Sequence, residues 1–372
     1  MYITTVKKNN TITNTDYNTL MSLVIEPAKY YKTTLFIEQP TPFNKLSLTQ
    51  QYRINDVIRA IQEAYHILEP FKDNYTEQYY EFKIPKRSGG LRTINAPLTN
   101  FKDALSKVKD IFEQKIKCLA HNAAYAYTKF RSTYDALELH QRNQSNWYLK
   151  LDLQDFFPSC TPEFIYSQLM QLYPFAYIVT PCVLDQLKEI IKMCCLNGGL
   201  PQGTPMSPLL TNLIMVPFDY HIHKLLSRGT GEHYVYTRYA DDILISSKNN
   251  FDWRALQTQL TGILRPFTIK ESKTRYGSRA GSNWNLGLML NKDNNITLGS
   301  VKKKQLNAML NNFLKDFVTN TIWTKEDTYA LQGQMSYLKH IEPDYYNYIL
   351  QKYEAKYNTT YALALKNVLN PD

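Results

Sequence analysis

The residues best suited to chemistry are three aspartates, Asp152, Asp241 and Asp242. Asp241 and Asp242 form an acidic pair inside HYVYTRYADDILISSK, with apolar strand-forming residues on both sides. Neighbouring strand residues point to opposite faces, so a tight hairpin would present the first carboxylate to a metal and leave the second beside it. Ionised carboxylates are costly among apolar residues unless a metal or another cation neutralises them. The pair therefore predicts a cation site.

Asp152 would complete this site, because it ends the alternating segment YLKLDL. Two strands that each deliver a carboxylate to one end of a sheet make a hard oxygen site suited to Mg²⁺. Two such ions about 3.5–4 Å apart would hold the attacking and leaving oxygens of an in-line phosphoryl displacement. This chemistry suits the transfer of a nucleotide to a 3′-hydroxyl. Taken singly, each aspartate is also explained as a solvated turn residue.

Two further segments have the composition of nucleotide-binding loops. Residues 200–208 are LPQGTPMSP, in which Gly and Pro fix a stiff loop and Ser207 can cap the helix that follows. Residues 84–92 are IPKRSGGLR and place Lys86 and Arg92 on the two sides of a hairpin turn. That spacing suits a clamp on a triphosphate. A plain helix entry and a plain basic turn would also explain the two segments.

The overall composition is that of a basic protein. Its 43 Lys and Arg exceed its 33 Asp and Glu, which gives a net charge of +10, as expected of a protein that holds a polyanion. The five cysteines are odd in number and form no CxxC pair, so neither a disulfide framework nor a zinc site is predicted. No apolar run could span a bilayer, and the first residues lack a secretory signal. The sequence predicts a cytoplasmic protein without a membrane partner.

The elements that would position these residues follow from the hydrophobic pattern. The segments YYEFKIP and LRTINAP predict a strand pair joined at residues 88–90, and the Asp241 region predicts two short strands around a turn. The C-terminal part, after residue 291, is mostly helical in pattern. Further helices are predicted from 3.6-residue periodicity over 47–68, 104–118, 183–195 and, as one helix, 207–226.

In this order the segments resemble the motif series of reverse transcriptases. The resemblance covers roughly residues 80–345 and includes seven elements in the family's order: IPKRSGGLRTINAP, AYAYTKFRSTYDAL, LKLDLQDFFPS, GGLPQGTPMSPLLTN, YTRYADDILISS, IKESKT and NLGLMLN. It implies an α+β fold shaped as a right hand. The implied parts are an N-terminal extension (1–50), fingers (51–147), a palm with an antiparallel sheet and a finger insertion near 158–200 (148–295), and a helical thumb (296–372).

The resemblance also implies roles for single residues. Asp152, Asp241 and Asp242 would bind Mg²⁺, with Mn²⁺ as the alternative ion and the Leu153 carbonyl as an additional ligand. Phe157 falls where the family places a steric gate against a ribose 2′-hydroxyl. The remaining implied roles are nucleotide contacts at Gln202, Gly203 and Tyr239, a triphosphate clamp at Lys86 and Arg92, a template or finger-loop contact at Arg131, and protonation of pyrophosphate by Lys273.

Within the family, two departures count against retron enzymes. The NAxxH element of those enzymes is replaced by DALEL at 135–139, and their VTG element by NLG at 285–287. The resemblance is then to defence-associated and abortive-infection reverse transcriptases, which implies dNTPs, a non-coding RNA template and a DNA product as partners. A homo-oligomer or an accessory defence protein stays open.

Four other hypotheses remain at this point. They are a template-independent or protein-primed DNA synthase, a retron reverse transcriptase, an RNA polymerase and a catalytically inactive RNA-binding scaffold. Phe157 argues against the RNA polymerase, and the intact aspartates argue against the scaffold. Tyrosines 345, 346, 348, 353 and 357 would be compatible with protein priming, but helix packing explains them too.

Overall fold

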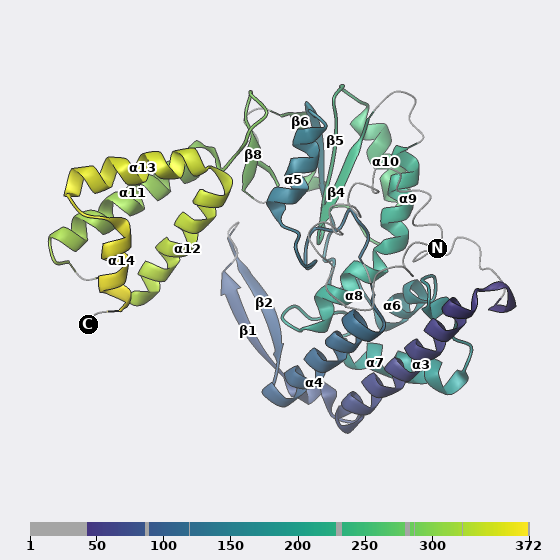
Figure 1. Cartoon of the computed structure of the whole chain (residues 1–372). Coiled ribbons are helices and arrows are strands. Elements are labelled where there is room, and N and C mark those ends of the chain that lie inside the picture. Colours follow the sequence, from purple (N-terminus) through teal and green to yellow (C-terminus); the bar gives the residue numbers. More distant parts are fainter. Residues whose placement is uncertain are drawn as a thin grey trace.

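The computed structural model describes residues 43–85, 89–118, 120–227, 233–279, 283–285, 287–321 and 323–370. These residues form a helical base with a projecting hairpin, a central antiparallel sheet, a small second sheet and a C-terminal helical bundle set to one side (Figure 1). This arrangement confirms the predicted α+β right hand of fingers, palm and thumb. The domain boundaries stay predictions, and most of the N-terminal extension lies outside the described residues.

The fingers begin with α3 (Leu48–Leu68), whose first turn is held by a capping box between Ser47 and Gln50. Its buried face packs on α4 (Thr99–Asp110) and α7 (Pro181–Met193). The helix predicted over 104–118 is α4 followed by a π-helical turn, Ile111–Lys115. Short 3-10 helices join the larger elements at Phe43–Lys45, Glu69–Phe71, Tyr75–Gln78 and Phe175–Tyr177.

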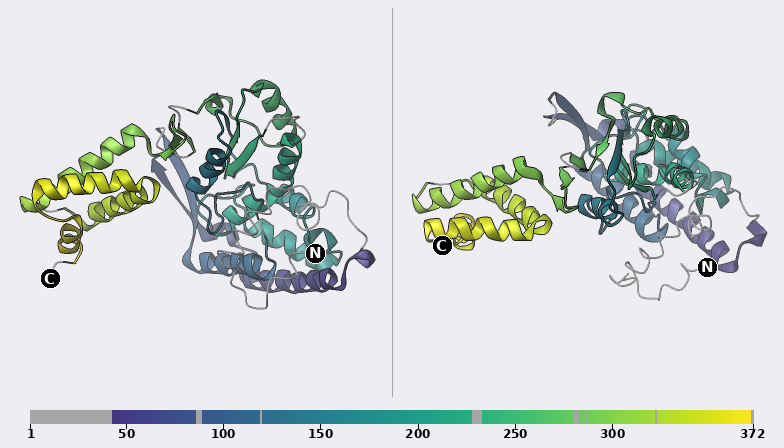
Figure 2. Two further views of the ribbon diagram at one scale, coloured as in Figure 1. Left: turned by 45° about the horizontal axis from the view of Figure 1, so that its top comes forward. Right: turned by 90° about the horizontal axis from the view of Figure 1, so that it is seen from above.

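The predicted strand pair is an antiparallel hairpin of β1 (Tyr79–Pro85) and β2 (Leu91–Pro97). Gly89 and Gly90 in its turn have φ of 86° and 79°, which other residues rarely adopt. All of β1 after its first residue is exposed. The hairpin stands out from the base on the side where the thumb lies (Figures 1 and 2).

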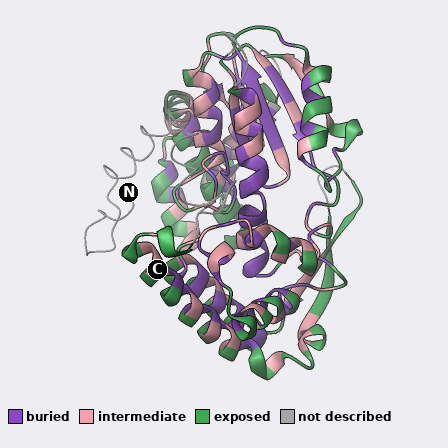
Figure 3. Cartoon of the chain, turned by 90° about the vertical axis from the view of Figure 1, so that its right-hand side faces the viewer, coloured by how far each residue is buried: buried purple, intermediate pink, exposed green. Residues whose placement is uncertain are grey.

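The palm sheet has the strand order β4-β5-β3-β6. Its central pair places Asp152 directly opposite Asp242. The four strands are β3 (Trp147–Asp152), β4 (Val235–Tyr239), β5 (Asp242–Ser247) and β6 (Arg275–Ser278). Buried side chains line most of these strands (Figure 3).

The two faces of this sheet belong to two different hydrophobic cores. Leu149, Leu151 and Ile243 point into a core shared with the base, whereas Tyr148 and Leu244 point into a core shared with the thumb. The alternation of strand side chains produces this division. One face of the sheet therefore packs on the helical base, while the other packs on the C-terminal bundle.

Helices α6 (Pro162–Leu169), α8 (Met206–Ile214), α9 (Val216–Leu226) and α10 (Trp253–Ile263) contribute to the core on the base side. The prediction of one continuous helix over 207–226 is wrong, because the chain is interrupted at Met215. Pro217 lies in the first turn of α9, where its missing N–H costs nothing.

The other face is covered by α5 (Thr133–Arg142) and a small sheet of β7 (Asn283–Asn285), β8 (Leu288–Leu290) and β9 (Ile296–Thr297). The Trp284 ring stacks on Tyr148 at 5.1 Å between centroids. The thumb follows as α11 (Gly299–Val318), α12 (Lys325–Ile341), α13 (Pro343–Tyr357) and α14 (Tyr361–Leu369). No helix in the described ranges is long and apolar enough to cross a membrane.

Candidate active site

The turn between β4 and β5 presents Asp241 to a cavity, and Asp242 begins the next strand. Ala240 in this turn has φ of 56°, a left-handed conformation unusual for a residue with a side chain. Its carbonyl accepts a hydrogen bond from Arg238 Nη1 at 3.1 Å. The Asp241 carbonyl accepts one from the Leu153 N–H at 3.1 Å. The backbone thus ties this turn to the end of β3.

Each of the two facing carboxylates is paired with a lysine. Lys273 Nζ, in the 3-10 turn Glu271–Lys273, lies 2.6 Å from Asp152 Oδ2. Lys150 Nζ lies 3.1 Å from Asp242 Oδ2. The sheet end therefore holds three carboxylates and two cations, and the carboxylates are in excess.

This crowding shifts the proton affinities of the groups. Burial raises the pKa of Asp241, and the nearby carboxylates of Asp242 and Asp152 raise it further, while Lys273 opposes them. Partial burial alone would lower the pKa of Lys273, but its hydrogen bond to Asp152 and the surrounding carboxylates raise it overall. The ammonium is therefore held in its charged form, and the site as a whole favours cations.

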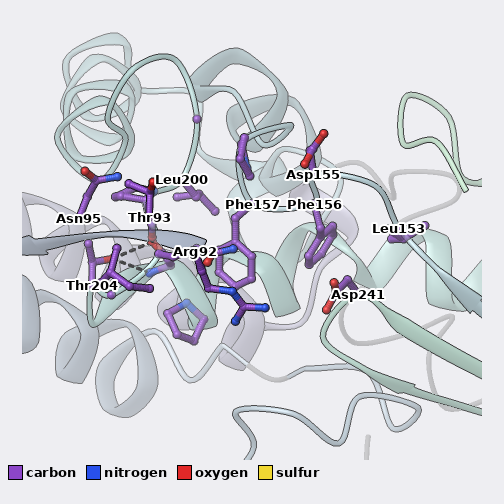
Figure 4. A pocket seen from close by; sticks show the side chains of 18 of the residues that line it. Arg92, Thr93, Asn95, Leu153, Asp155, Phe156, Phe157, Leu200, Thr204 and Asp241 are labelled. Atoms are coloured by element: carbon purple, nitrogen blue, oxygen red, sulfur yellow. Dashed lines mark hydrogen bonds between the residues drawn. The ribbon is translucent and has the colours of Figure 1, made fainter. Parts of the chain in front are cut away.

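The cavity beside the turn has a volume of about 910 Å³, which lies within the range of small-molecule sites. Its walls come from β2, the end of β3, the turn after β4, the segment after β3 and the loop before α8. Figure 4 shows Arg92, Phe157 and Asp241 around this space, with the Asp155 carboxylate turned away from Asp241. Lys270 and Lys273 line it as well.

The loop before α8 is fixed against the fingers hairpin. The Gln202 carbonyl accepts a hydrogen bond from the Asn95 N–H at 3.0 Å. Gly203 has φ of 116°, and a Cβ there would lie 2.8 Å from Ile94 Cγ2, so a larger residue does not fit. Ser207 does not cap α8 as predicted, because it lies within the helix and its hydroxyl donates to the Pro201 carbonyl at 2.7 Å. The side chain that accepts from its N–H is Thr204.

Phe157 lines the cavity, and its ring packs edge-on against Phe156 at 5.7 Å between centroids. Its carbonyl accepts from the Leu200 N–H at 3.1 Å, which joins this segment to the loop before α8. In Figure 4 the ring is seen between Asp241 and Thr204 of that loop. An aromatic group in this place can restrict what enters the cavity beside Asp241.

Several predicted site residues are placed differently. Lys86 lies outside the described residues. Arg131 points its guanidinium at backbone carbonyls, with Nη1 at 2.9 Å from the oxygens of Asn122 and Ala124. Within the described part of the chain, the residues that line the cavity include Arg92, Leu153, Gln202 and Gly203 but not Arg131, Tyr239 or Asp242.

Sequence reasoning missed two residues of the cavity wall. Tyr127 lines it with φ of 58°, and burial and the nearby Asp241 raise the pKa of its hydroxyl. Lys270 also lines it, and its N–H donates to the Asp152 carbonyl at 2.8 Å. Both belong to motif segments quoted from the sequence, AYAYTKF and IKESKT. No local signal distinguished them from their neighbours.

The donor set fits a divalent cation that is shared with a substrate. In the part of the chain that the structure describes, no three His, Cys, Asp or Glu side chains are grouped so that they alone could hold a metal ion. Mg²⁺ is commonly held by one or two carboxylates and completed by waters and substrate phosphates. Asp152 and Asp241 supply the carboxylates. Leu153 and Ile269 form an isolated antiparallel bridge. The two hydrogen bonds of this bridge run from the Gln154 N–H to the Thr268 carbonyl and from the Lys270 N–H to the Asp152 carbonyl, so the bridge does not use the Leu153 carbonyl.

Comparison with known proteins identifies relatives over most of the chain. A family model described as reverse transcriptase (RNA-dependent DNA polymerase) matches residues 84–290. The Retron Ec83 reverse transcriptase of Escherichia coli is 28% identical over 314 residues, which cover 80% of this chain and 94% of that protein. The Retron Ec73 reverse transcriptase of the same species is 30% identical over 282 residues, covering 73% and 86%.

Among solved structures, a telomerase from Candida albicans in complex with a TWJ fragment of telomeric RNA aligns with a TM-score of 0.43 and 12% identity, covering 95% of this chain and 68% of that one. The sequence relatives are retron enzymes, although the chain departs from two retron motifs at 135–139 and 285–287. These two departures do not separate the chain from retron enzymes in overall similarity.

Proposed function

Because this chain belongs to the reverse transcriptase family and is an RNA-directed DNA polymerase, we propose that it copies a structured non-coding RNA into DNA as part of bacterial anti-phage defence. The observation that carries the proposal is the meeting of Asp152 and Asp241 with Arg92, Lys270 and Lys273 around one cavity of nucleotide size. Carboxylates and cations that line one cavity match a triphosphate and the metal ions that accompany it.

In the proposed reaction, Asp152 and Asp241 hold Mg²⁺, with the Leu153 carbonyl as an additional ligand. When bound, Mg²⁺ supplies charge stabilisation for the attacking and leaving oxygens. The primer 3′-hydroxyl loses its proton to water, its oxygen forms a bond to the α-phosphorus of a dNTP, and the bond to pyrophosphate breaks. Arg92 and Lys270 orient the phosphates, and Lys273 gives a proton to the leaving pyrophosphate. Asp242, paired with Lys150, supports the site from beside it.

The choice of deoxynucleotides is assigned to Phe157, whose ring would meet a ribose 2′-hydroxyl. Replacing it by Ala should permit incorporation of rNTPs, and Phe157→Tyr should preserve discrimination because the ring remains. Primer extension with each nucleotide class measures this. Unchanged discrimination in Phe157→Ala would count against the gate.

The relatives favour a retron-type enzyme over an abortive-infection synthase, since those that match over most of their length are named retron reverse transcriptases. For protein priming, two of the five thumb tyrosines offer little support, whereas Tyr348 is 58% exposed. Tyr353 and Tyr357 on α13 donate their hydroxyls to Asn307 and Asn311 of α11. A role as an inactive scaffold would leave the clustered carboxylates without a purpose. We place the protein in the cytoplasm.

The decisive test is the double variant Asp241→Ala, Asp242→Ala. We expect it to lose Mg²⁺-dependent dNTP incorporation and protection against phage. The matched control is Asp185→Asn on α7, whose side chain is 72% exposed. Protection that persists without the aspartates would overturn a role through DNA synthesis. Sequencing of copurified nucleic acid should yield one structured RNA and its DNA copy, whereas DNA attached to protein would favour the protein-primed alternative.

A further inference from the structure

Arg238 is the largest fully buried side chain among the described residues, with 1% exposure. It lies on β4 and forms a two-pronged ion pair with Asp219 of α9, with Nε at 3.0 Å from Oδ1 and Nη2 at 2.9 Å from Oδ2. Both side chains are 0% exposed. Burial alone would lower the pKa of Arg238, but the Asp219 carboxylate beside it raises the pKa overall.

Such a pair is not explained by stability alone. Two charges lose their hydration when they are buried, and well-packed apolar residues of similar size often serve a fold equally well. The pair therefore calls for another reason, and the remaining contacts of Arg238 supply one. Its Nη1 donates to the Ala240 carbonyl at 3.1 Å and lies 3.3 Å from Asn212 Oδ1 of α8.

The Ala240 carbonyl belongs to the peptide that precedes Asp241. A peptide group is planar. The direction of the Ala240 carbonyl therefore fixes the orientation of the Asp241 nitrogen and Cα, which lie in the same plane. Ala240 is held at φ of 56°, where an alanine is strained. A fixed donor beneath the carbonyl keeps the turn in this conformation.

The same network reaches two other walls of the cavity. The Arg238 N–H donates to the Ala123 carbonyl at 2.6 Å, and the Arg238 carbonyl accepts from the Tyr125 N–H at 2.8 Å. Asn212 Nδ2 donates to the Ala126 carbonyl at 2.8 Å. Tyr127, the next residue, lines the cavity, and α8 follows the loop that contains Gln202.

We infer that Asp219 and Arg238 are positioning residues, which aim the Asp241 carboxylate at the metal site by holding the Ala240 peptide from the buried face of the sheet. This inference rests on the proposed polymerase function. Asp219 fixes the guanidinium through two bonds, and the Tyr236 hydroxyl donates a further bond to Asp219 Oδ1 at 2.5 Å. With Nε and Nη2 held by Asp219, Arg238 Nη1 can point only toward the turn.

The test replaces the pair by apolar residues of similar size, Asp219→Leu with Arg238→Met. This double variant keeps the interior filled but has no donor for the Ala240 carbonyl. We expect thermal unfolding within a few degrees of wild type and Mn²⁺ binding weakened about 10–100-fold, the range typical of losing a residue that orients a metal ligand. Binding is measured by the electron paramagnetic resonance signal of free Mn²⁺ during titration, which requires no catalysis.

Two further variants keep the test decisive if the double variant does not fold. Arg238→Lys retains the charge but lacks the planar fork that bonds Asp219 through two nitrogens and Ala240 through a third, so it should fold and bind Mn²⁺ more weakly. Tyr236→Phe removes only one bond to Asp219 and leaves the bonds of Arg238 in place, so it should weaken Mn²⁺ binding less than Arg238→Lys does. As a control, Lys303→Met with Glu342→Gln removes an ion pair in the thumb without touching the turn.

A folded Arg238→Lys or double variant with wild-type Mn²⁺ affinity would overturn the inference. That result would leave the proposed function in place. Conversely, DNA synthesis by Asp241→Ala, Asp242→Ala would remove the proposed function, whatever Mn²⁺ binding shows.

Discussion

Two aspartate–cation pairs lie on opposite faces of the palm sheet and differ in their access to water. Arg238 and Asp219 are both 0% exposed. In contrast, Lys273 is 52% exposed while its partner Asp152 is 8% exposed. We call a fully buried pair sealed and a partly exposed pair open. A sealed pair keeps its two partners, whereas in an open pair a metal ion can replace the lysine. The fold therefore buries the pair that holds the turn in place and leaves partly exposed the pair that would change partner in the proposed reaction.

Lys150 and Asp242 lie between these extremes, at 15% and 19% exposure. The three pairs therefore form a series from sealed to open within one sheet. If burial decides their roles, the cost of breaking each pair should fall along this series. The following predictions test that order, beginning with the largest expected effect.

Arg238→Met should lower the free energy of unfolding by about 3–5 kcal/mol, because it leaves the Asp219 carboxylate buried without its partner. Urea denaturation at neutral pH measures the loss. The double variant with Asp219→Leu is the matched control and should recover most of it. A loss below about 1 kcal/mol for the single variant would contradict the sealed character of this pair.

Acid should act on buried groups whichever face they occupy. His140 is 0% exposed on the carboxylate-bearing side, where it bonds to Ser246 and Thr237. Burial lowers the pKa of His140 from 6.5 to about 3. Protons therefore bind the unfolded chain first as the pH falls below 6.5, and stability is lost down to about pH 3.

Because of this histidine, the free energy of unfolding should fall by about 2 kcal/mol between pH 6.5 and pH 5. Urea denaturation at both pH values measures it, and His140→Gln should reduce the difference. His121 and His223, whose pKa values burial also lowers, account for a remaining slope. Equal acid sensitivity in the variant and the wild type would show that His140 is protonated in the folded state.

Lys150→Met should cost about 1–2 kcal/mol, between the values for sealed and exposed pairs. It should also free Asp242, so that Mn²⁺ binding changes together with stability. Denaturation and Mn²⁺ titration on the same preparation measure both. A cost equal to that of Arg238→Met would mean that exposure does not order the series.

Lys273→Met should change stability by less than about 1 kcal/mol, because solvent screens this pair. Mn²⁺ should bind more tightly without the competing ammonium, while the rate of nucleotide addition should fall about 10²-fold or more if Lys273 is the general acid. Titration and single-turnover extension separate the two effects. Weaker Mn²⁺ binding would show that the lysine supports the metal site instead of competing for it.

The sequence supported the local elements well because their signals are local. The hairpin at residues 79–97 and the strands around Asp241 follow from two-residue periodicity and turn residues, and both are present. The break at Met215 was missed because the apolar pattern continues through it. The pairing of Lys273 with Asp152 was not predictable, since any of many lysines could have filled that place.

Arg238 carried a signal that was available but unused. In the strand VYTRY it alternates with Thr237 and shares a face with Tyr236, so the strand pattern already places a cation toward the core. A buried cation requires a partner. Which acid provides it depends on the packing of α9 against the sheet, and that is a property of the tertiary structure.

The backbone bonds of Arg238 also have a consequence for the order of folding. They join β4 to residues 123–125, far back in the chain, and the side chain needs α8 and α9 in place. Contacts between residues far apart in the chain form slowly, because the chain loses conformational entropy on closing the loop before the contacts stabilise it. We therefore expect the turn that carries Asp241 to be among the last parts of the chain to take shape, so that an incompletely folded chain would lack a complete candidate active site.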